Sequence, residues 1–253
     1  MSECVHSSTN TILDGNNNAD IRKIQHTYDR LWHESRAEIT RGNVHTDPIP
    51  GHRSGSTRWG ASLLLRPAPA VAERMEAVIA RFRPLIGEQH IFYSAASLHT
   101  TIRVYEYYRE PITLQDPEVQ RYAEITQAVA NHFPPMQIYY QGLTATQRGI
   151  LAQGYPLTTT IQHFRQALRD RLTVEGLNHG PEQHYARDIT HNSLCVFNGP
   201  LLNPQQTCTF IEQERTLDLG STTVTTLDFV YYQRTANTVT PITLATIKLA
   251  GND

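Results

Sequence analysis

The sequence is poor in cysteine and has no excess of charge of either sign. Its cysteines are three in number, Cys4, Cys195 and Cys208, and their odd count and irregular spacing argue against a disulfide framework and for reduced thiols. The formal net charge is −2 with the histidines neutral, so the chain has no basic field for tracking long nucleic acid. The low cysteine content and the near-neutral charge therefore argue against a disulfide scaffold and against a protein that tracks along long nucleic acid.

Long apolar runs are also missing. No stretch approaches the roughly 18 residues that a membrane span needs. The first residues, Met1 to His6, lack the basic and then apolar pattern of a signal peptide. We therefore expect a soluble, cytoplasmic protein without a membrane partner.

A length of 253 residues allows one bilobal domain or two small ones.

One short pattern occurs twice: a histidine, any residue, a hydroxyl residue and an apolar residue. The copies are His99-Thr100-Thr101-Ile102 and His191-Asn192-Ser193-Leu194. Each copy leads into a stretch rich in β-branched or aromatic residues, at 100–105 and 192–197, and this composition predicts two strands.

Alternation along a strand places the functional groups of each copy on one face. His99 and Thr101 share a face, about 7 Å apart, and so do His191 and Ser193. A hydroxyl can donate to an oxyanion while an imidazole moves a proton near neutral pH. Two facing pairs would supply the acid, the base and the charge stabilisation that attack at phosphorus requires. The alternative is a pair of satisfied structural histidines.

The same alternation predicts further residues around this site. Arg103 and Tyr105 share the face of His99, so Arg103 could neutralise a phosphate and Tyr105 could stack on a base. Tyr93 and Tyr185 each lie six residues before a motif histidine and are also candidates for substrate binding. The alternative is that the residues beyond the motifs fill a core.

An internal repeat surrounds the two motifs. Residues 60–65 predict a strand and 69–86 an amphipathic helix before the first motif, and 149–154 and 157–172 repeat this order before the second. Two strand-helix-strand units predict two pseudo-symmetric lobes whose motifs meet at a central cleft.

With these motifs, residues 58–250 resemble the two-histidine (2H) phosphoesterase superfamily, which includes LigT-like cyclic phosphodiesterases. The segment Ala96 to Thr101 is typical of the first motif of that family. The resemblance implies an α+β fold with two antiparallel sheet-plus-helix lobes, about 58–148 and 149–253, in one domain over 58–253. It also implies that the cleft lies between the lobes.

The resemblance further implies a chemistry. His99 and His191 would be the acid and base, Thr101 and Ser193 would hold the phosphate, and neither a metal nor another cofactor would be needed. The substrate would be a nucleotide, a cyclic nucleotide or a short oligonucleotide, cleaved at a 2′,3′-cyclic phosphate or another 2′-linked phosphodiester. The alternatives are a cyclic-oligonucleotide or RNA 3′-end-processing phosphodiesterase, and a non-catalytic module that binds AMP-like nucleotides. A scaffold that binds protein partners is a third class.

Residues 1–57 lie outside the repeat and are expected to form an extension. It consists of a tail over 1–18, a helix over 19–41 with an apolar stripe, and a loop over 42–58 rich in Pro and Gly. We expect the helix to pack on a lobe, although its stripe could also serve a partner. The Gly and Pro content of 174–188 is typical of a mobile loop, such as a lid over the cleft.

Overall fold

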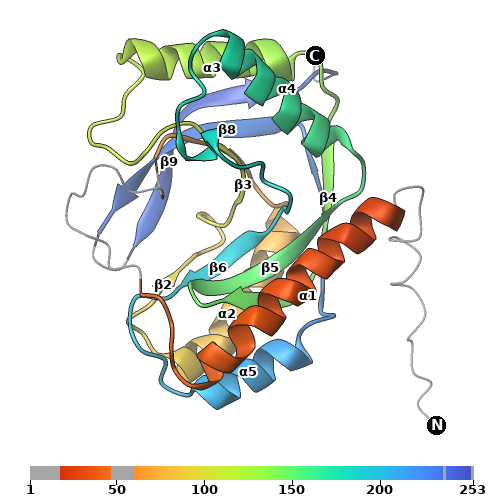
Figure 1. The fold of residues 1–253 in the computed structure, drawn as a ribbon, viewed down its shortest axis with the longest axis vertical. Coiled ribbons are helices and arrows are strands. Elements are labelled where there is room, and N and C mark those ends of the chain that lie inside the picture. The colour runs from red at the N-terminus through yellow and green to blue at the C-terminus, as the bar shows by residue number, and fades with distance from the viewer. Residues whose placement is uncertain (1–17, 47–57, 59, 236–237, 252–253) are drawn as a thin grey trace.

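The computed structural model describes residues 18–46, 58, 60–235 and 238–251 (Figure 1). Apart from Asn18, the expected tail lies outside the described residues, and so do residues 47–57 of the expected loop. The elements, in chain order, are α1 (Asn18–Thr40), β1 (Ser62–Leu65), α2 (Pro69–Ile86), β2 (Ile91–Phe92), β3 (Thr100–Val104), α3 (Pro117–Ala130), β4 (Met136–Thr146), β5 (Gly149–Pro156), α4 (Thr160–Val174), the 3-10 helix η1 (Pro181–Gln183), β6 (Asn192–Val196), α5 (Pro204–Gln213), β7 (Asp218–Val224), β8 (Thr226–Arg234) and β9 (Val239–Lys248).

Within the described residues, nine strands form one sheet, and the pairings between neighbouring strands are antiparallel. The order is β7-β4-β5-β6-β3-β1-β8-β9, with β2 added beside β6. Figure 1 shows the sheet curling around the centre of the molecule. The α+β class and the antiparallel, cleft-forming architecture expected from the sequence are confirmed.

Helices cover the sheet at its two ends. α3 and α4 pack together beside β3 and β9, at the top of Figure 1, and α2 and α5 pack together beside β4, β6 and β7, at the bottom. The sheet thus has two halves, one built from β3, β1, β8 and β9 and the other from β2, β6, β5, β4 and β7. They join where β3 pairs with β6, at Thr100 and Asn192.

The two halves are interleaved along the chain. α2 follows β1 but packs on β6 and β7, and α4 follows β5 but packs on β3. β4 belongs to the half that holds β5, and β8 to the half that holds β1. The expected chain ranges 58–148 and 149–253 therefore do not each build one half, because each strand-helix-strand unit crosses from one half to the other.

The apolar periodicity of the helices accounts for the core. α2 begins with a proline at its first turn, where the missing N–H costs nothing, and buries one face against the sheet. Its buried side chains recur at three- and four-residue spacing and include Val71, Met75, Val78, Ile79 and Phe82. No helix of the described part of the chain is both long and apolar enough to cross a membrane.

α1 packs against β4 and β5 and is part of the fold. Tyr28 is fully buried, its ring meets Tyr155 edge-on at 5.7 Å between centroids, and its hydroxyl contacts the backbone of Gly154. This hydroxyl donates to the Gly154 carbonyl at 3.2 Å and accepts from the Gly154 N–H at 3.0 Å. The stripe expected on this helix thus meets the sheet.

We predict that Tyr28→Phe lowers the free energy of unfolding by about 1–3 kcal/mol, because the Gly154 N–H loses its buried acceptor. Tyr28→Ala also leaves a cavity and should cost about 3–5 kcal/mol. Urea unfolding followed by circular dichroism measures both changes. Arg30→Gln is the matched control, because this α1 side chain is 57% exposed. Unfolding energies for Tyr28→Phe equal to those of the unchanged protein would contradict the contact.

Candidate functional site

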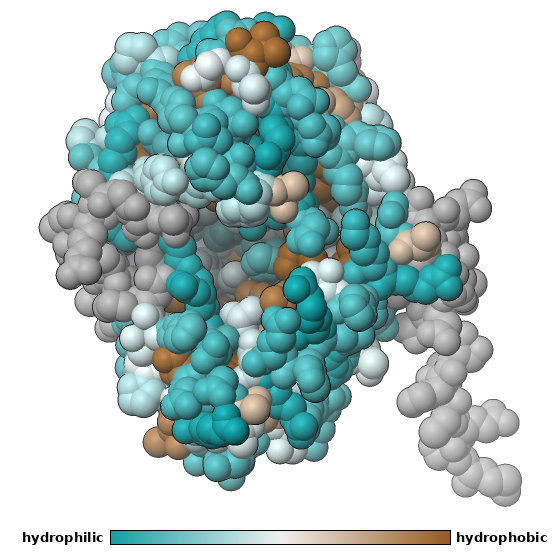
Figure 2. Space-filling model, viewed as in Figure 1, coloured by the Kyte–Doolittle hydropathy of each residue, from teal (hydrophilic) through white to brown (hydrophobic). Residues whose placement is uncertain are grey.

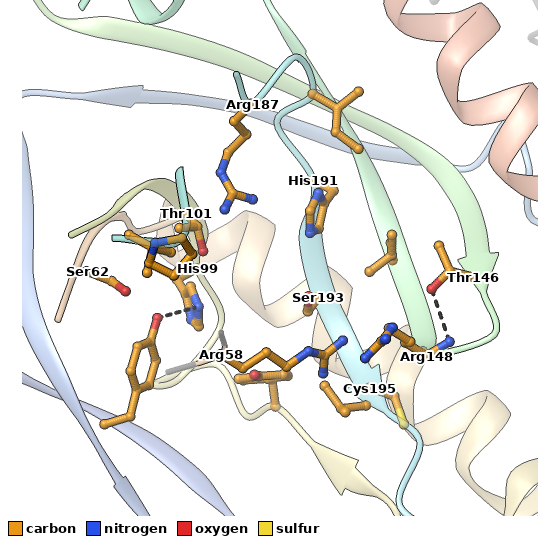
Figure 3. Close-up of a pocket in the computed structure, with 18 of the residues that line it drawn as sticks. Arg58, Ser62, His99, Thr101, Thr146, Arg148, Arg187, His191, Ser193 and Cys195 are labelled. Atoms are coloured by element: carbon orange, nitrogen blue, oxygen red, sulfur yellow. Dashed lines mark hydrogen bonds between the residues drawn. The ribbon is translucent and has the colours of Figure 1, made fainter. Parts of the chain in front are cut away.

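A cleft of about 680 Å³ lies where β3 meets β6. The space-filling view is hollowed at the centre of the molecule, between the two helix pairs (Figure 2). The described residues that line the cleft include His99, Thr101, His191, Ser193, Arg58, Arg148, Arg187, Tyr93, Tyr107, Tyr185 and Tyr232. Figure 3 shows both motifs facing this space.

The strand register brings the motifs together. Thr100 pairs with Asn192 in antiparallel orientation, so His99 lies across from Ser193 and Thr101 across from His191. Thr100 and Asn192 point to the opposite face and are fully buried. Each imidazole therefore has the hydroxyl of the other motif as its cross-strand neighbour. The four residues expected from the sequence line one cleft.

His99 is held in one orientation by its surroundings. Its Nδ1 lies 2.8 Å from the Ser97 carbonyl, which can only accept, so Nδ1 carries the proton and Nε2 has the lone pair in the neutral ring. Tyr93 meets the ring edge-on, with centroids 5.5 Å apart, and the Tyr232 hydroxyl lies 3.3 Å from Nε2. Burial lowers the pKa of His99 to about 4.

His191 is half-buried and less restrained. Its Nδ1 has no hydrogen-bond partner among the described residues. Burial, followed by the positive charges of Arg187 and Arg165, lowers the pKa of His191 to about 3. Both motif histidines are therefore neutral at pH 7 in the protein without a ligand.

The expectation that Arg103 and Tyr105 face the cleft is wrong. Arg103 is 2% exposed and packs beside Glu182 and Asn178, and Tyr105 is 1% exposed, with its hydroxyl 2.6 Å from Thr126 Oγ1. Both side chains lie in the interior, on the side of β3 away from the two histidines.

A β-bulge explains this error. Leu64 pairs with Thr101 while Leu63 pairs with Arg103, so Ile102 is an extra residue in β3 and the alternation of faces shifts there. Val104 consequently lines the cleft in place of Arg103. β6 has the same irregularity at Leu194, because its partners Leu151 and Ile150 pair with Ser193 and Cys195. The apolar fourth residue of each motif is thus a bulge residue.

Four tyrosines stand around the two histidines. Tyr93 and Tyr185 line the cleft, as their spacing from the motifs suggested, and Tyr107 and Tyr232 line it as well. Tyr185 is 47% exposed and Tyr107 38% exposed, so both present ring surface at the cleft. An exposed aromatic ring of this kind can stack on a nucleobase.

Three arginines in the cleft were missed from the sequence: Arg58, Arg148 and Arg187. Figure 3 shows Arg187 on one side of the two histidines, with Arg58 and Arg148 on the other. Among the described lining residues there is no Asp, Glu or Lys. Arg148 lies in the turn between β4 and β5, so its place could be predicted from the sequence only if β4 were predicted first. No periodicity marks Arg187, which lies in an irregular linker.

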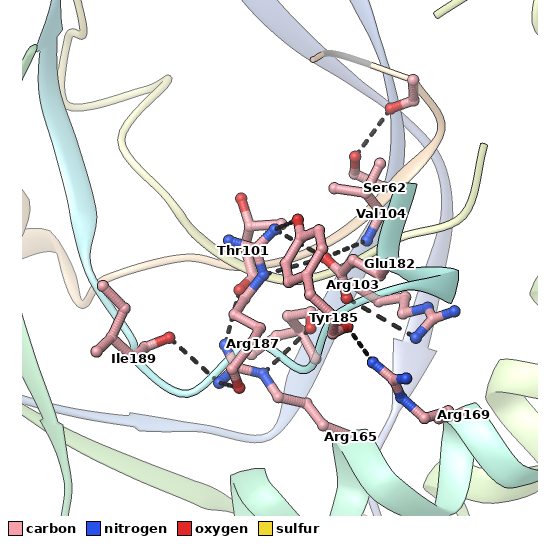
Figure 4. Close-up of polar contacts among 12 residues, drawn as sticks. Ser62, Thr101, Arg103, Val104, Arg165, Arg169, Glu182, Tyr185, Arg187 and Ile189 are labelled. Atoms are coloured by element: carbon pink, nitrogen blue, oxygen red, sulfur yellow. Dashed lines mark hydrogen bonds and ion pairs between the residues drawn. The ribbon is translucent and has the colours of Figure 1, made fainter. Parts of the chain in front are cut away.

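A buried carboxylate fixes Arg187. Glu182 Oε1 accepts from Arg187 Nη2 at 2.7 Å and from the Val104 N–H at 3.1 Å, while its Oε2 lies 3.8 Å from Arg103 (Figure 4). Glu182 is 2% exposed. Glu182 of η1 thus joins the segment 174–188 to β3, and Arg103 contacts the same carboxylate from the interior.

Arg165 of α4 connects the two motif segments. Its guanidinium donates to the carbonyls of Thr101 and Ile102 in β3, at 2.9 and 3.2 Å. It also donates to the carbonyls of Arg187 and Ile189, each at 3.2 Å (Figure 4). Burial lowers the pKa of Arg165 to about 9, which still leaves the side chain charged at pH 7. One cation therefore fixes the first motif relative to the chain that leads into the second.

The site combines two imidazoles, two hydroxyls and three guanidinium groups. Such a lining can hold a phosphate anion and move protons on both sides of it. Among the described residues, no group of three or more His, Cys, Asp or Glu side chains is placed to hold a metal ion.

Neither a protein-family model nor a curated protein matches the sequence. The structure does have solved counterparts. TT0787 of Thermus thermophilus aligns with a TM-score of 0.57 at 14% identity, over 76% of this chain and 99% of that one. E. coli LigT in complex with 3′-AMP aligns with a TM-score of 0.54 at 10% identity, over 76% and 98% of the two chains.

A third counterpart is the conserved protein ATU0111 from Agrobacterium tumefaciens, with a TM-score of 0.52 at 15% identity over 82% of this chain and 97% of that one. At identities of 10–15%, the structural similarity establishes the fold alone. The chain has the LigT-like fold that the resemblance to 2H phosphoesterases implied.

We predict that Arg187→Gln raises the pKa of His191, because the cation beside it penalises the imidazolium. Nuclear magnetic resonance of the imidazole protons across a pH series measures both motif histidines. In the unchanged protein we expect values of about 4 for His99 and about 3 for His191. Arg171→Gln removes a surface charge outside the cleft and should leave both values in place. An unchanged pKa of His191 in Arg187→Gln would contradict this electrostatic account.

Proposed function

We propose that this protein is a phosphodiesterase that uses His99 and His191 as its acid and base and needs no metal ion. The substrate is a nucleotide or short RNA with a 2′,3′-cyclic phosphate or another 2′-linked phosphodiester. The observation that carries the proposal is the antiparallel juxtaposition of the motifs, in which each histidine has the other motif's hydroxyl across the strand pair.

The chemistry follows from this geometry. A phosphate between the motifs accepts hydrogen bonds from Thr101 and Ser193 on its non-bridging oxygens, and Arg187 offsets its charge. The unprotonated His99 Nε2, which faces the Tyr232 hydroxyl at 3.3 Å in the protein without a ligand, takes the proton of the attacking water in place of that contact. The new bond from oxygen to phosphorus forms, the bond from phosphorus to the ribose oxygen breaks, and the leaving oxygen receives a proton from His191.

Protonation of His191 depends on the substrate. Without a ligand its pKa of about 3 leaves it neutral at pH 7. A bound phosphate adds negative charge beside the ring and offsets the arginines, and both changes raise the pKa. The acid is thus prepared by the ligand on which it acts, and proton uptake accompanies binding.

Nucleotide recognition is supported by the cleft and by a counterpart. The exposed rings of Tyr185 and Tyr107 offer stacking surfaces next to the motifs. LigT, whose fold this chain shares, has a structure in complex with 3′-AMP. The size of the cleft and its additional arginines also suit a cyclic oligonucleotide or an RNA 3′ end, which is the alternative substrate class.

We predict that EDTA-treated protein hydrolyses at least one member of a panel of 2′,3′-cyclic nucleotides, 2′-5′ and 3′-5′ linked dinucleotides and cyclic dinucleotides. His99→Ala or His191→Ala should each lower turnover about a hundredfold or more, because each removes one proton transfer. Product analysis by chromatography measures the rate and the position of the product's phosphate. His26→Ala on α1 is the matched control, because His26 is exposed.

Loss of activity on chelation, or full activity in the His99→Ala/His191→Ala double variant, would overturn the mechanism. Saturable nucleotide binding without turnover of any substrate would favour a nucleotide-binding module in place of an enzyme.

A further inference from the structure

The cleft contains more positive charge than a single phosphodiester requires. Its described lining includes three arginines and no carboxylate, although the whole chain has a net charge of −2. A cleft with one sign of charge focuses its potential on ligands of the opposite sign. The arrangement of these arginines is therefore informative about the ligand.

The arginines belong to two separate places. Arg187 stands beside the histidines and is fixed by Glu182, whereas Arg58 and Arg148 extend into the opposite end of the cleft, past Ser193 (Figure 3). Arg58 comes from the chain before β1 and Arg148 from the turn between β4 and β5, and both line the cleft. A cleft lined by arginines, with no carboxylate among its described lining residues, favours an anion.

The backbone of Arg148 is hydrogen-bonded to its neighbours, and its side chain is exposed at the cleft. The Phe197 N–H donates to the Arg148 carbonyl at 3.0 Å, and the adjacent Gly149 pairs with Val196 at the end of β6. Because Leu194 is a bulge residue, Val196 and Ser193 pair with Gly149 and Leu151, which are two residues apart and correspond to about 7 Å along a strand. An anion held by Arg148 is thus near the reacting phosphate but distinct from it.

We propose that Arg148 and Arg58 form a second phosphate subsite, so that the preferred substrate has a phosphate group in addition to the diester that is cleaved. This inference rests on the proposed function and narrows its substrate class to nucleotides or short oligonucleotides with two or more phosphates. A guanidinium group suits this task because its planar fork binds phosphate oxygens in pairs.

The test compares substrates that differ by one phosphate. Adenosine 2′,3′-cyclic phosphate and a 2′-5′ linked adenosine dinucleotide are each assayed with and without a 5′-phosphate. In the unchanged protein we expect KM to fall about tenfold when the 5′-phosphate is present on at least one of the two, the value of one charge-assisted contact. In Arg148→Gln this preference should shrink to about twofold or less.

Arg171→Gln is the control for loss of one positive charge, because this side chain is 53% exposed and pairs with Glu175 on the surface. It should retain the full preference. Absence of a preference in the unchanged protein, or an undiminished preference in Arg148→Gln, would overturn the subsite while leaving the proposed function in place.

A second measurement separates the subsite from the proposed function. Calorimetric titration with adenosine 3′-monophosphate and adenosine 3′,5′-bisphosphate needs no turnover. Tighter binding of the bisphosphate that is lost in Arg148→Gln would support the subsite even if none of the four substrates were cleaved. Equal affinities for the two ligands would overturn it.

Discussion

The antiparallel meeting of β3 and β6 at Thr100 and Asn192 is the constraint on which the site depends. In this register, a histidine two residues before a hydroxyl on each strand yields two crossed pairs without any further adjustment. On the interior face of β3, Thr100 Oγ1 lies 2.7 Å from the hydroxyl of Tyr140 in β4. A slip of one residue in either strand would turn the histidine of that strand toward the core. The repeated motif therefore brings its four side chains together only because β3 pairs with β6 in this register.

Side chains behind the cleft maintain the distance between the two motif segments. Arg165 joins β3 to the chain before His191 through backbone carbonyls, and Glu182 joins β3 to Arg187. Burying such charges is costly unless they are paired or hydrogen-bonded. Arg165 donates to four main-chain carbonyls, and Glu182 accepts from the Val104 N–H and the Arg187 guanidinium. Because the partners of Arg165 are backbone atoms, neighbouring side chains can change without loss of that connection. The interleaved helices also join the two halves of the sheet. α2 follows β1 but packs on β6 and β7, and α4 follows β5 but packs on β3.

Hydrophobic periodicity predicted the helices and strands whose residues follow a regular apolar spacing. The helix expected over 69–86 coincides with α2, and the strands that begin at Thr100, Gly149 and Asn192 begin where expected. α3 was overlooked although Asp116 and Pro117 form a readable N-terminal signal, with the Asp116 side chain accepting from the Glu118 N–H. The alternation rule failed at Ile102, since a bulge has no signature in a run of β-branched residues, and Arg103 and Tyr105 were misplaced for that reason. The arginines of the cleft come from a turn and from irregular segments, where position depends on tertiary contacts that a single sequence does not encode locally.

The low pKa values of the histidines and the cationic lining are linked. Burial is the largest cause of both low pKa values, and nearby arginines, which favour an anion and disfavour an imidazolium, lower the values further. A phosphate reverses the balance, because its charge offsets the guanidinium groups and stabilises a protonated ring. Under the proposed function, His191 becomes protonated when an anion is bound, and a ligand with more negative charge favours this protonation more strongly. Under the proposed function, a second phosphate would then improve binding and also favour the protonation state that the reaction needs.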